Sequence, residues 1–322
     1  MENLLAAWRE FVRGKRKKKD VQEFQHCLMD NVLGLHRELK TKTYTHGAYH
    51  VFNISDPKPR NIHKASVRDR LLHHAIYRKL YPFFDKTFIA DSYSCRIGKG
   101  THKAMGRFRQ FAYTVSKNHT RTVWVLKCDI RKFFASVDQK ILMDIVARYI
   151  QDADILWLIN QITCSFNSGT RGKGLPLGNL TSQLLVNVYM NEFDQFAKHT
   201  LKAKYYVRYA DDFVFVSHGK AWLVSLIPCV AKFLESRLAL SLHPDPSSPK
   251  ATNGRSKVFI KTLASGVDFL GWVHFPDHRV LRTTTKRRML RSLIDVSSEA
   301  SHQSYLGMLG HGNGKKLEDF IK

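Results

Sequence analysis

The sequence lacks the features of a secreted or membrane-embedded protein. Its five cysteines are odd in number, widely spaced and never in a CxxC pair, which argues against a disulfide framework and a zinc ribbon. No apolar run approaches the roughly 20 residues needed to cross a bilayer, and the first residues lack the layout of a cleavable signal. We therefore expect a soluble, cytoplasmic protein with reduced thiols and no membrane partner.

Acidic residues are scarce relative to basic ones. The 322 residues include 27 Asp and Glu against 52 Lys and Arg, a formal net charge of +25. This excess predicts a polyanionic partner, either nucleic acid or an acidic surface, and argues against a small neutral substrate. The excess is smallest over 121–248, which is typical of cationic flanks that clamp a phosphate backbone around a metal-binding centre. A basic surface without a partner is the alternative.

Apolar periodicity predicts a mixed α/β chain without internal repeats. Apolar residues at spacings of three and four predict helices over 2–13, 20–41, 67–81, 140–151 and 180–198. His73 and His74 fall in one of these helices, and a core or surface role is favoured over metal binding because no further ligand lies one turn away. Two prolines, Pro57 and Pro59, interrupt an extended segment over 49–63.

Short β-branched runs predict the strands. The run TVWVLKCDI over 122–130 predicts a buried strand that ends at an aspartate, and YYVRYADDFVFVS predicts a hairpin with acids at its tip. The Pro- and Ser-rich stretch 243–256 predicts an exposed loop. Strands over 257–261 and 267–275 follow, and the residues after Gly271 are expected to be mainly helical and basic, too few for a further nuclease domain.

Three aspartates carry the expected chemistry. Asp129 closes the predicted strand, and Asp211 and Asp212 occupy the hairpin tip. Carboxylates at the ends of such elements can converge on two divalent cations, the arrangement that phosphoryl transfer requires, and their hard oxygens suit Mg²⁺. Paired aspartates in a turn are also common as turn formers, so the pair alone decides nothing.

The order of four motifs favours metal binding by these aspartates over a role as turn formers. DIRKFF, GLPLGNLTSQ, YADD and the FLG of Phe269, Leu270 and Gly271 follow one another along the chain. This ordered set resembles the palm of reverse transcriptases over about residues 40–300. The resemblance implies an α/β (α+β) right-hand polymerase, with an N-terminal helical extension over 1–48, fingers over 49–121, a palm over 122–275 that includes fingers elements around 150–176, and a short helical thumb over 276–322.

The resemblance also implies catalytic roles. Asp129 and Asp211 match the metal-binding aspartates of the palm, Asp212 matches the second acid of the pair, and Ile130 offers its backbone carbonyl. Two Mg²⁺ ions, for which Mn²⁺ can substitute, are the implied cofactors. Phe134 matches the aromatic residue that excludes a 2′-hydroxyl, whereas Phe133 is expected to pack in the core.

Further positions match nucleotide and nucleic-acid contacts of the family. Arg60, then Lys58, matches the grip on the triphosphate, where bidentate guanidinium chemistry favours the arginine. The implied nucleotide-binding set is completed by Leu177, Gly178, Gln183 and Lys257, the last a candidate for protonating pyrophosphate. The implied nucleic-acid contacts are Arg68, Arg96, Phe269, Leu270, Gly271, Arg287 and Arg288.

Two positions in the glycine-rich motif resemble a particular subfamily. Leu177 and Gln183 stand where most related enzymes carry a glutamine and a proline, and in this they resemble the reverse transcriptases of diversity-generating retroelements. That likeness implies errors at template adenines, because leucine cannot make the hydrogen bond that glutamine makes to the incoming nucleotide. A tolerated core substitution in an ordinary polymerase is the alternative.

The implied activity is RNA-directed DNA synthesis. Its partners are an RNA template, a DNA or RNA primer, deoxynucleoside triphosphates and an accessory protein subunit. Three alternatives stay open: a retron-like or antiviral-defence reverse transcriptase, a noncatalytic RNA-binding protein with a polymerase-like palm, and a two-metal nuclease.

Overall fold

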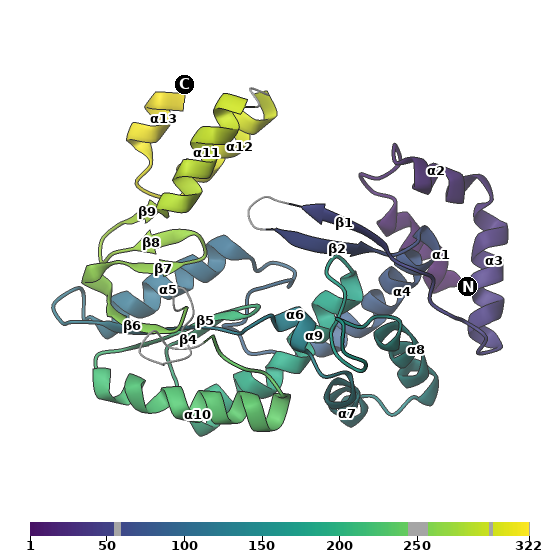
Figure 1. The fold of residues 1–322 in the computed structure, drawn as a ribbon, viewed down its shortest axis with the longest axis horizontal. Coiled ribbons are helices and arrows are strands. Elements are labelled where there is room, and N and C mark those ends of the chain that lie inside the picture. The colour runs from purple at the N-terminus through teal and green to yellow at the C-terminus, as the bar shows by residue number, and fades with distance from the viewer. Residues whose placement is uncertain (55–58, 244–256, 296–298, 322) are drawn as a thin grey trace. The chain divides into compact units, whose positions relative to one another are not determined.

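The computed structural model describes residues 1–54, 59–243, 257–295 and 299–321 (Figure 1). It divides into two compact units that alternate along the chain. The first comprises Met1–Ile89, Arg131–Asp194 and Leu234–Leu240, and the second Ala90–Ile130, Gln195–Phe233 and Ser241–Lys322. Lys58 and the expected loop over 244–256 lie outside the described residues. The consecutive fingers, palm and thumb ranges stay a prediction.

The first unit combines helices with one antiparallel hairpin. Its helices are α1 (Glu2–Phe11), α2 (Lys19–His26), α3 (Leu28–Lys40), α4 (Val67–Phe84), α6 (Phe133–Ser136), α7 (Gln139–Tyr149), α8 (Ala153–Cys164) and most of α9 (Leu180–Gln195). The hairpin pairs β1 (His50–Ile54) with β2 (Arg60–Lys64). Its main core joins α1, α3 and α4 through buried side chains that include Trp8, Phe11, Val32, Leu35 and Leu71.

Most helices expected from apolar spacing are confirmed, with one correction. The single helix expected over 20–41 is two helices, because Cys27 leaves the helical region with φ −112° and ψ 42°. The Asn31 side-chain amide donates to the carbonyl of Phe24 at 3.0 Å, so this carbonyl keeps a partner next to the break. Apolar spacing does not predict α8 or the helices Thr101–Val115 and Lys220–Leu238.

A four-stranded antiparallel sheet forms the centre of the second unit. Its strands run in the order β4 (Tyr206–Tyr209), β5 (Asp212–Ser217), β3 (Trp124–Asp129), β6 (Phe259–Thr262). The helix α5 (Thr101–Val115) packs on one face through Phe108, Phe111 and Ala112. The helix α10 (Lys220–Leu238) lies on the other face (Figure 1). The predicted buried strand and the hairpin are thereby confirmed.

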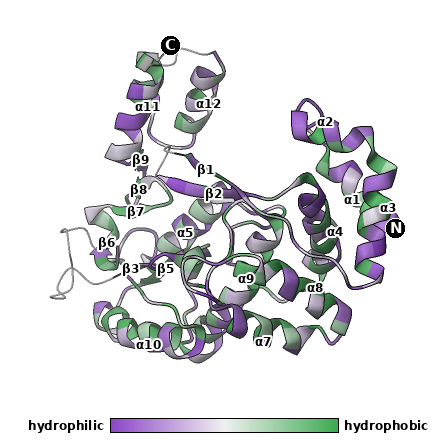
Figure 2. Cartoon of the chain, turned by 45° about the vertical axis from the view of Figure 1, so that its right-hand side comes forward, coloured by the Kyte–Doolittle hydropathy of each residue, from purple (hydrophilic) through white to green (hydrophobic). Residues whose placement is uncertain are grey.

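The C-terminal part of this unit is mainly helical, as expected. A small antiparallel sheet of β7 (Val267–Phe269), β8 (Trp272–His274) and β9 (Arg279–Leu281) leads into α11 (Thr283–Asp295), α12 (Glu299–Leu309) and α13 (Lys315–Ile321). A separate hydrophobic core joins this part to α5; its buried side chains are Met105, Trp272, Leu281, Met289 and Leu309. Figure 2 shows hydrophilic residues along much of α11. None of the described helices is long and apolar enough to cross a membrane.

The core of the first unit contains a histidine that resists protonation. His73 is 1% exposed, its Nε2 lies 3.2 Å from Nε2 of His46, and burial lowers its pKa to about 3. The expected core role is therefore favoured. Among the described residues, no group of three or more metal-ligating side chains includes it.

Acid is expected to weaken the fold through this histidine. The unfolded chain takes up the proton below about pH 6.5 while the folded chain does not, so the free energy of unfolding falls as pH drops from 6.5 toward 3. Thermal unfolding at pH 7.5 and 5.5 checks this, and His73→Gln should show a smaller change between the two. An equal change in both proteins would contradict the assignment.

Candidate functional site

The registers of β3 and β5 place two of the three expected aspartates directly opposite each other. Asp129 ends β3, Asp212 begins β5, and the two are cross-strand partners in the antiparallel pair. The preceding residues of β3 are buried on both sides, with Val125, Leu126 and Cys128 inaccessible to solvent. A strand buried on both faces fixes its register firmly, so the position of the Asp129 backbone is well determined.

The third aspartate lies in the tight turn that joins β4 to β5. Tyr209 and Asp212 are paired, which leaves Ala210 and Asp211 as a two-residue hairpin loop. Ala210 has φ 55°, a left-handed conformation that costs a residue with a β-carbon about 1–2 kcal/mol. The amide of Ile130 donates to the carbonyl of Asp211 at 3.3 Å. This bond ties the turn to the residue that follows Asp129.

A buried arginine supports the strained turn. Arg208 is 0% exposed, and its Nη1 donates to the carbonyl of Ala210 at 3.1 Å while its Nη2 donates to Oγ of Ser92 at 3.0 Å. The backbone of Arg208 is also bonded on both sides, to Asp91 and Tyr93. No local sequence pattern indicated this role, because Ser92 and Arg208 lie 116 residues apart along the chain.

Replacement of Arg208 by lysine is expected to slow catalysis without weakening substrate binding. Lysine keeps the charge but lacks the planar fork that reaches both acceptors, and a shift of about 1 Å in a catalytic group can cost roughly a hundredfold in rate. In the RNA-directed DNA synthesis that the motif resemblance implies, steady-state primer extension should show a kcat lowered about ten- to a hundredfold with KM nearly unchanged. Arg237→Lys, at an exposed position of α10, serves as the control. Equal kcat values for Arg208→Lys and the wild type would contradict this role.

A lysine from β3 neutralises Asp212. Nζ of Lys127 lies 3.3 Å from Oδ2 of Asp212, and the two side chains are 8% and 19% exposed. Burial, although opposed by Lys127, acts together with the charges of Asp129 and Asp211 to raise the pKa of Asp212 to about 7. Sequence reasoning missed Lys127, although its position two residues before Asp129 places it on the same face of the strand.

Asp129 contacts two basic side chains of its own. Nζ of Lys257 lies 3.2 Å from its carboxylate, and Nε2 of His243 lies 3.4 Å from Oδ1. Lys257 and His243 are 3.0 Å apart, and the amide of His243 donates to the carbonyl of Asp129 at 3.0 Å. Lys257 therefore lies beside the expected catalytic centre. His243 joins it unforeseen, from the start of a segment whose sequence indicated only a loop.

The donors of this carboxylate centre, Asp129, Asp211 and Asp212, suit a divalent cation. No group of three or more His, Cys, Asp and Glu side chains in the described part of the chain is arranged to hold a metal ion, and two of the carboxylates bind lysines. The chemistry still fits, because three carboxylates and the nearby carbonyl of Ile130 are hard oxygen ligands. Among the residues that the structure describes, none hydrogen-bonds to the buried Oδ1 of Asp212, so this oxygen fits a cation ligand.

In the first unit, the glycine-rich segment is joined to β2. The amide of His63 donates to the carbonyl of Leu177 at 3.0 Å. Gly178 has φ 111°, and a Cβ there would lie 3.1 Å from Cγ2 of Ile62, so both its backbone and its packing favour glycine. Arg60, at the start of β2, is exposed. These contacts hold the expected nucleotide-binding residues of β2 and of the glycine-rich segment together.

Comparison with known families decides the assignment. The family described as "Reverse transcriptase (RNA-dependent DNA polymerase)" matches residues 54–272, well over half of the chain. The chain belongs to the reverse transcriptase family. The matched range includes the carboxylate centre and the glycine-rich segment.

Relatives of this reverse transcriptase are bacterial and organellar. Protein YkfC of Escherichia coli is 25% identical over 282 residues, covering 76% of this chain and 69% of YkfC. Nuclear intron maturase 1, mitochondrial, of Arabidopsis thaliana is 26% identical over 92 residues, covering 29% of this chain and 12% of the maturase. The chain thus spans only a small part of the length of the maturase.

Solved structures similar to this reverse transcriptase include telomerases. A telomerase from Candida albicans in complex with a fragment of telomeric RNA gives a TM-score of 0.51 at 10% identity, covering 75% of this chain and 46% of that one. A truncated apo telomerase from Candida tropicalis gives 0.50 at 11% identity, covering 79% and 60%. At these identities the likeness shows the fold alone, and that fold is the right-hand polymerase fold.

Two further expected contact residues of the reverse transcriptase have partners within the protein. The Arg68 guanidinium binds Glu38 and lies 3.0 Å from Oδ1 of Asp69. It thereby joins α3 to α4, a structural role that competes with the expected contact to template or triphosphate. Nη1 of Arg96 donates to the carbonyl of Ser92 at 3.0 Å.

The remaining expected residues differ in exposure. Phe133 is buried, as expected, while Phe134 and Gln183 are half-buried. Phe269 is fully buried among α5 and the sheets, so its side chain cannot contact nucleic acid, and Leu270 and Gly271 are left as candidates for that contact. Arg287 is exposed and Arg288 half-buried on α11.

Proposed function

We propose that this chain is an RNA-directed DNA polymerase that adds deoxynucleotides to a primer 3′-hydroxyl. The observation that carries the proposal is the carboxylate centre: Asp129 and Asp212 face each other across two strands, and Asp211 lies in the adjoining turn. The family match supports the same activity. A noncatalytic RNA-binding protein would have no need for three carboxylates gathered at one end of a sheet.

Two Mg²⁺ ions would be held by Asp129, Asp211 and the Ile130 carbonyl, and Asp212 would lie beside them. Mn²⁺ can substitute for Mg²⁺. Bound there, the ions supply Lewis-acid activation of the 3′-hydroxyl and neutralisation of the leaving group. The protein's own groups act around them. Lys257 would move from Asp129 to donate a proton to pyrophosphate, and Lys127 limits the negative charge that Asp212 adds to the centre.

Residues of the first unit would bind the incoming nucleotide. Arg60 is proposed to grip the triphosphate, together with Lys58, and Phe134 to exclude a 2′-hydroxyl by its bulk. Support comes from the exposed position of Arg60 on β2 and from the half-buried ring of Phe134, whose carbonyl accepts a 2.8 Å hydrogen bond from Leu175 of the glycine-rich segment. Leu177, Gly178 and Gln183 would form the surface against which the base pair lies.

The activity is tested by primer extension on an RNA template with Mg²⁺ and either deoxynucleotides or ribonucleotides. We expect extension with deoxynucleotides and little with ribonucleotides. Labelled RNA and DNA incubated with Mg²⁺ but without nucleotides should stay intact. Cleavage of the nucleic acid without any extension would favour a nuclease, and binding without either reaction would favour a noncatalytic protein.

The copying is further proposed to be error-prone at template adenines, as in diversity-generating retroelements. Support comes from Leu177, whose side chain can pack against the nascent pair but cannot hydrogen-bond to it. One neutral hydrogen bond contributes about 1 kcal/mol, or roughly fivefold in discrimination. The likeness to intron maturases and YkfC supports only the wider family.

Leu177→Gln is therefore expected to lower misincorporation opposite adenine about fivefold, with other template bases little affected. Sequencing of cDNA from a defined RNA template measures all errors at once. Leu177→Met, which keeps the volume without adding a hydrogen-bonding group, should behave as the wild type. If wild-type errors were no more frequent at adenines than at other bases, the proposal of adenine-specific errors would be wrong.

A further inference from the structure

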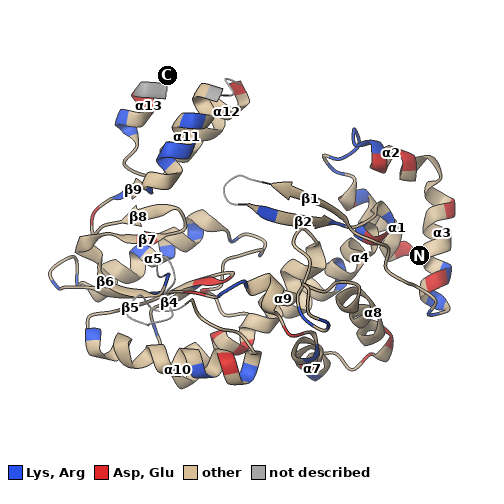
Figure 3. Cartoon of the chain, in the orientation of Figure 1, with Lys and Arg blue, Asp and Glu red and all other residues tan. Residues whose placement is uncertain are grey.

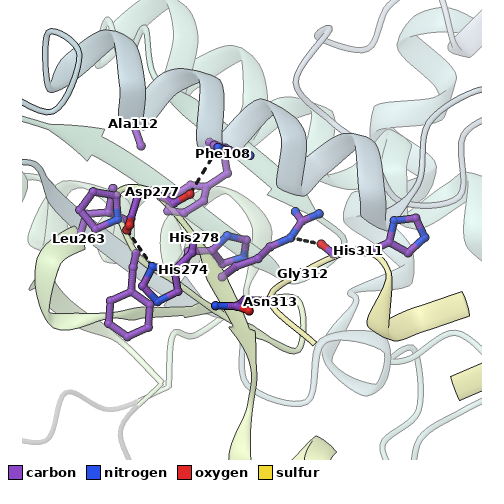
Figure 4. A pocket seen from close by; sticks show the side chains of 13 residues that line it. Phe108, Ala112, Leu263, His274, Asp277, His278, His311, Gly312 and Asn313 are labelled. Carbon is purple, nitrogen blue, oxygen red and sulfur yellow. Dashed lines mark hydrogen bonds and ion pairs between the residues drawn. The ribbon is translucent and has the colours of Figure 1, made fainter. Parts of the chain in front are cut away.

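A cavity of about 230 Å³ lies in the second unit, lined by none of the residues of the carboxylate centre (Figure 4). Its walls come from α5, from the hairpin between β8 and β9, and from the turn after α12. We call it the Arg109 pocket. The volume is below the roughly 300–1,000 Å³ of pockets for drug-sized ligands, so one small ligand fills it.

The walls of the Arg109 pocket are fixed by the fold. The amide of Asn313 donates to the carbonyl of Arg279 at 2.9 Å, which joins the turn after α12 to β9. A Cβ on Gly312 would lie 2.0 Å from the Trp272 ring, so this turn packs directly on β8. Because the walls are held by backbone bonds and close packing, the cavity is a built feature of the unit.

The pocket carries an excess of positive charge. The Arg279 guanidinium donates to the carbonyl of His311, and Nη2 of Arg109 lies 3.4 Å from the carbonyl of Asp277. Both acceptors are neutral, and within the described part of the chain neither arginine lies within ion-pair distance of a carboxylate. Burial and repulsion from Arg109 both lower the pKa of Arg279. The Asp277 carboxylate lies 2.8 Å from Nδ1 of His278 and so has another partner.

Flat aromatic rings, two of phenylalanine and two of histidine, lie next to these charges. The rings of Phe275 and His278 stack with centroids 4.7 Å apart at 10°, and Phe108 packs edge-on to His274 at 5.1 Å. Leu263 and Ala112 complete the apolar wall, but like Phe108 they are almost fully buried, so the wall offers a ligand mainly the rings of Phe275 and His278. A ligand that satisfies both halves of the pocket has a planar ring and an anionic group, and guanidinium pairs match phosphate especially well.

We propose that the Arg109 pocket binds one nucleotide unit, with its base against the apolar wall and its phosphate between Arg109 and Arg279. The nucleotide is either free or part of an RNA strand, since both present the same ring and phosphate. This site is separate from polymerisation, and it lies where the C-terminal helices join α5 and the small sheet. An occupied pocket would add contacts between these elements.

Equilibrium binding without divalent cations tests the proposal. The probes are AMP, a 12-nucleotide RNA and inorganic phosphate. AMP is chosen because it lacks the triphosphate that a polymerase substrate needs. Arg109→Gln is the main variant because Arg109 is exposed and its loss should not disturb folding. Arg279→Gln is used if its thermal unfolding matches the wild type. Arg121→Gln, an exposed arginine of the same unit, removes the same charge and is the control.

We expect Arg109→Gln to weaken binding at least about tenfold, with Arg121→Gln unchanged. If AMP shows this difference, the ligand is a free nucleotide; if only the RNA shows it, the ligand is a nucleotide of a strand. If inorganic phosphate bound as tightly as AMP and the RNA, the proposal would be overturned. It would also be overturned if Arg109→Gln and Arg121→Gln bound every probe equally well. The measurement needs no catalysis, so its failure leaves the polymerase assignment untouched.

Discussion

Asp211→Asn is expected to lower the rate of primer extension by at least about a thousandfold. Asparagine keeps the size of the side chain but removes the charge that would bind a divalent cation. Metal ions contribute several kcal/mol of transition-state stabilisation, and each 1.4 kcal/mol is tenfold in rate. Single-turnover extension on an RNA template, with the protein in excess over primer, measures the loss without interference from product release.

The matched control is Asp144→Asn, which removes an exposed carboxylate from α7 of the first unit. It should extend the primer at the wild-type rate. Thermal unfolding should be nearly the same for all three proteins, because Asp211 lies in a turn whose backbone is held by Arg208 and Ile130. A rate for Asp211→Asn within tenfold of the wild type would contradict a catalytic role.

Binding to a primer–template is expected to fall steeply with salt. A protein that makes about 6–10 phosphate contacts loses roughly 10³–10⁵ in affinity between 50 and 200 mM salt. The protein has a net charge of +25, and α11 carries exposed cations (Figure 3). We therefore expect an affinity loss of roughly 10³–10⁵ over this salt range. Fluorescence anisotropy of a labelled RNA–DNA duplex across that salt range measures the slope.

A triple variant locates the contacts. Changing Lys286, Arg287 and Arg291 of α11 to alanine should reduce the slope by about 2–3, since each lost contact removes roughly 0.7–0.9. Changing Arg16, Lys17 and Lys18 to alanine removes the same charge from an exposed run before α2 and should alter the slope little. An equal reduction in both variants would mean that net charge, and not the position of α11, governs binding.

Local pattern was sufficient for the parts of the site that lie on regular elements. The β-branched run before Asp129 and the apolar β-formers on both sides of Ala210 predicted a buried strand and a hairpin, and both formed. Once these elements pair, their register alone brings Asp129 opposite Asp212. Motif order supplied the family, and the match over 54–272 confirmed it.

Contacts between distant segments could not be predicted. Arg208 reaches Ser92, and His243 reaches Asp129, over more than a hundred residues of sequence, and no periodic signal marks such pairs. Arg68 shows the same limit: the resemblance implies a contact with nucleic acid, and no local pattern indicated that Glu38 and Asp69 would lie beside its guanidinium. The break at Cys27 was hidden because apolar spacing continues across it, from Phe24 to Leu28.

Mn²⁺ binding measured by electron paramagnetic resonance tests the central claim most directly, because it reports the carboxylate centre without requiring the right template or primer. With a deoxynucleoside triphosphate present, the wild type should bind Mn²⁺ at least about tenfold more tightly than Asp129→Asn or Asp211→Asn, and Asp144→Asn should match the wild type. Equal Mn²⁺ affinity in all four proteins would contradict a metal centre built from these aspartates.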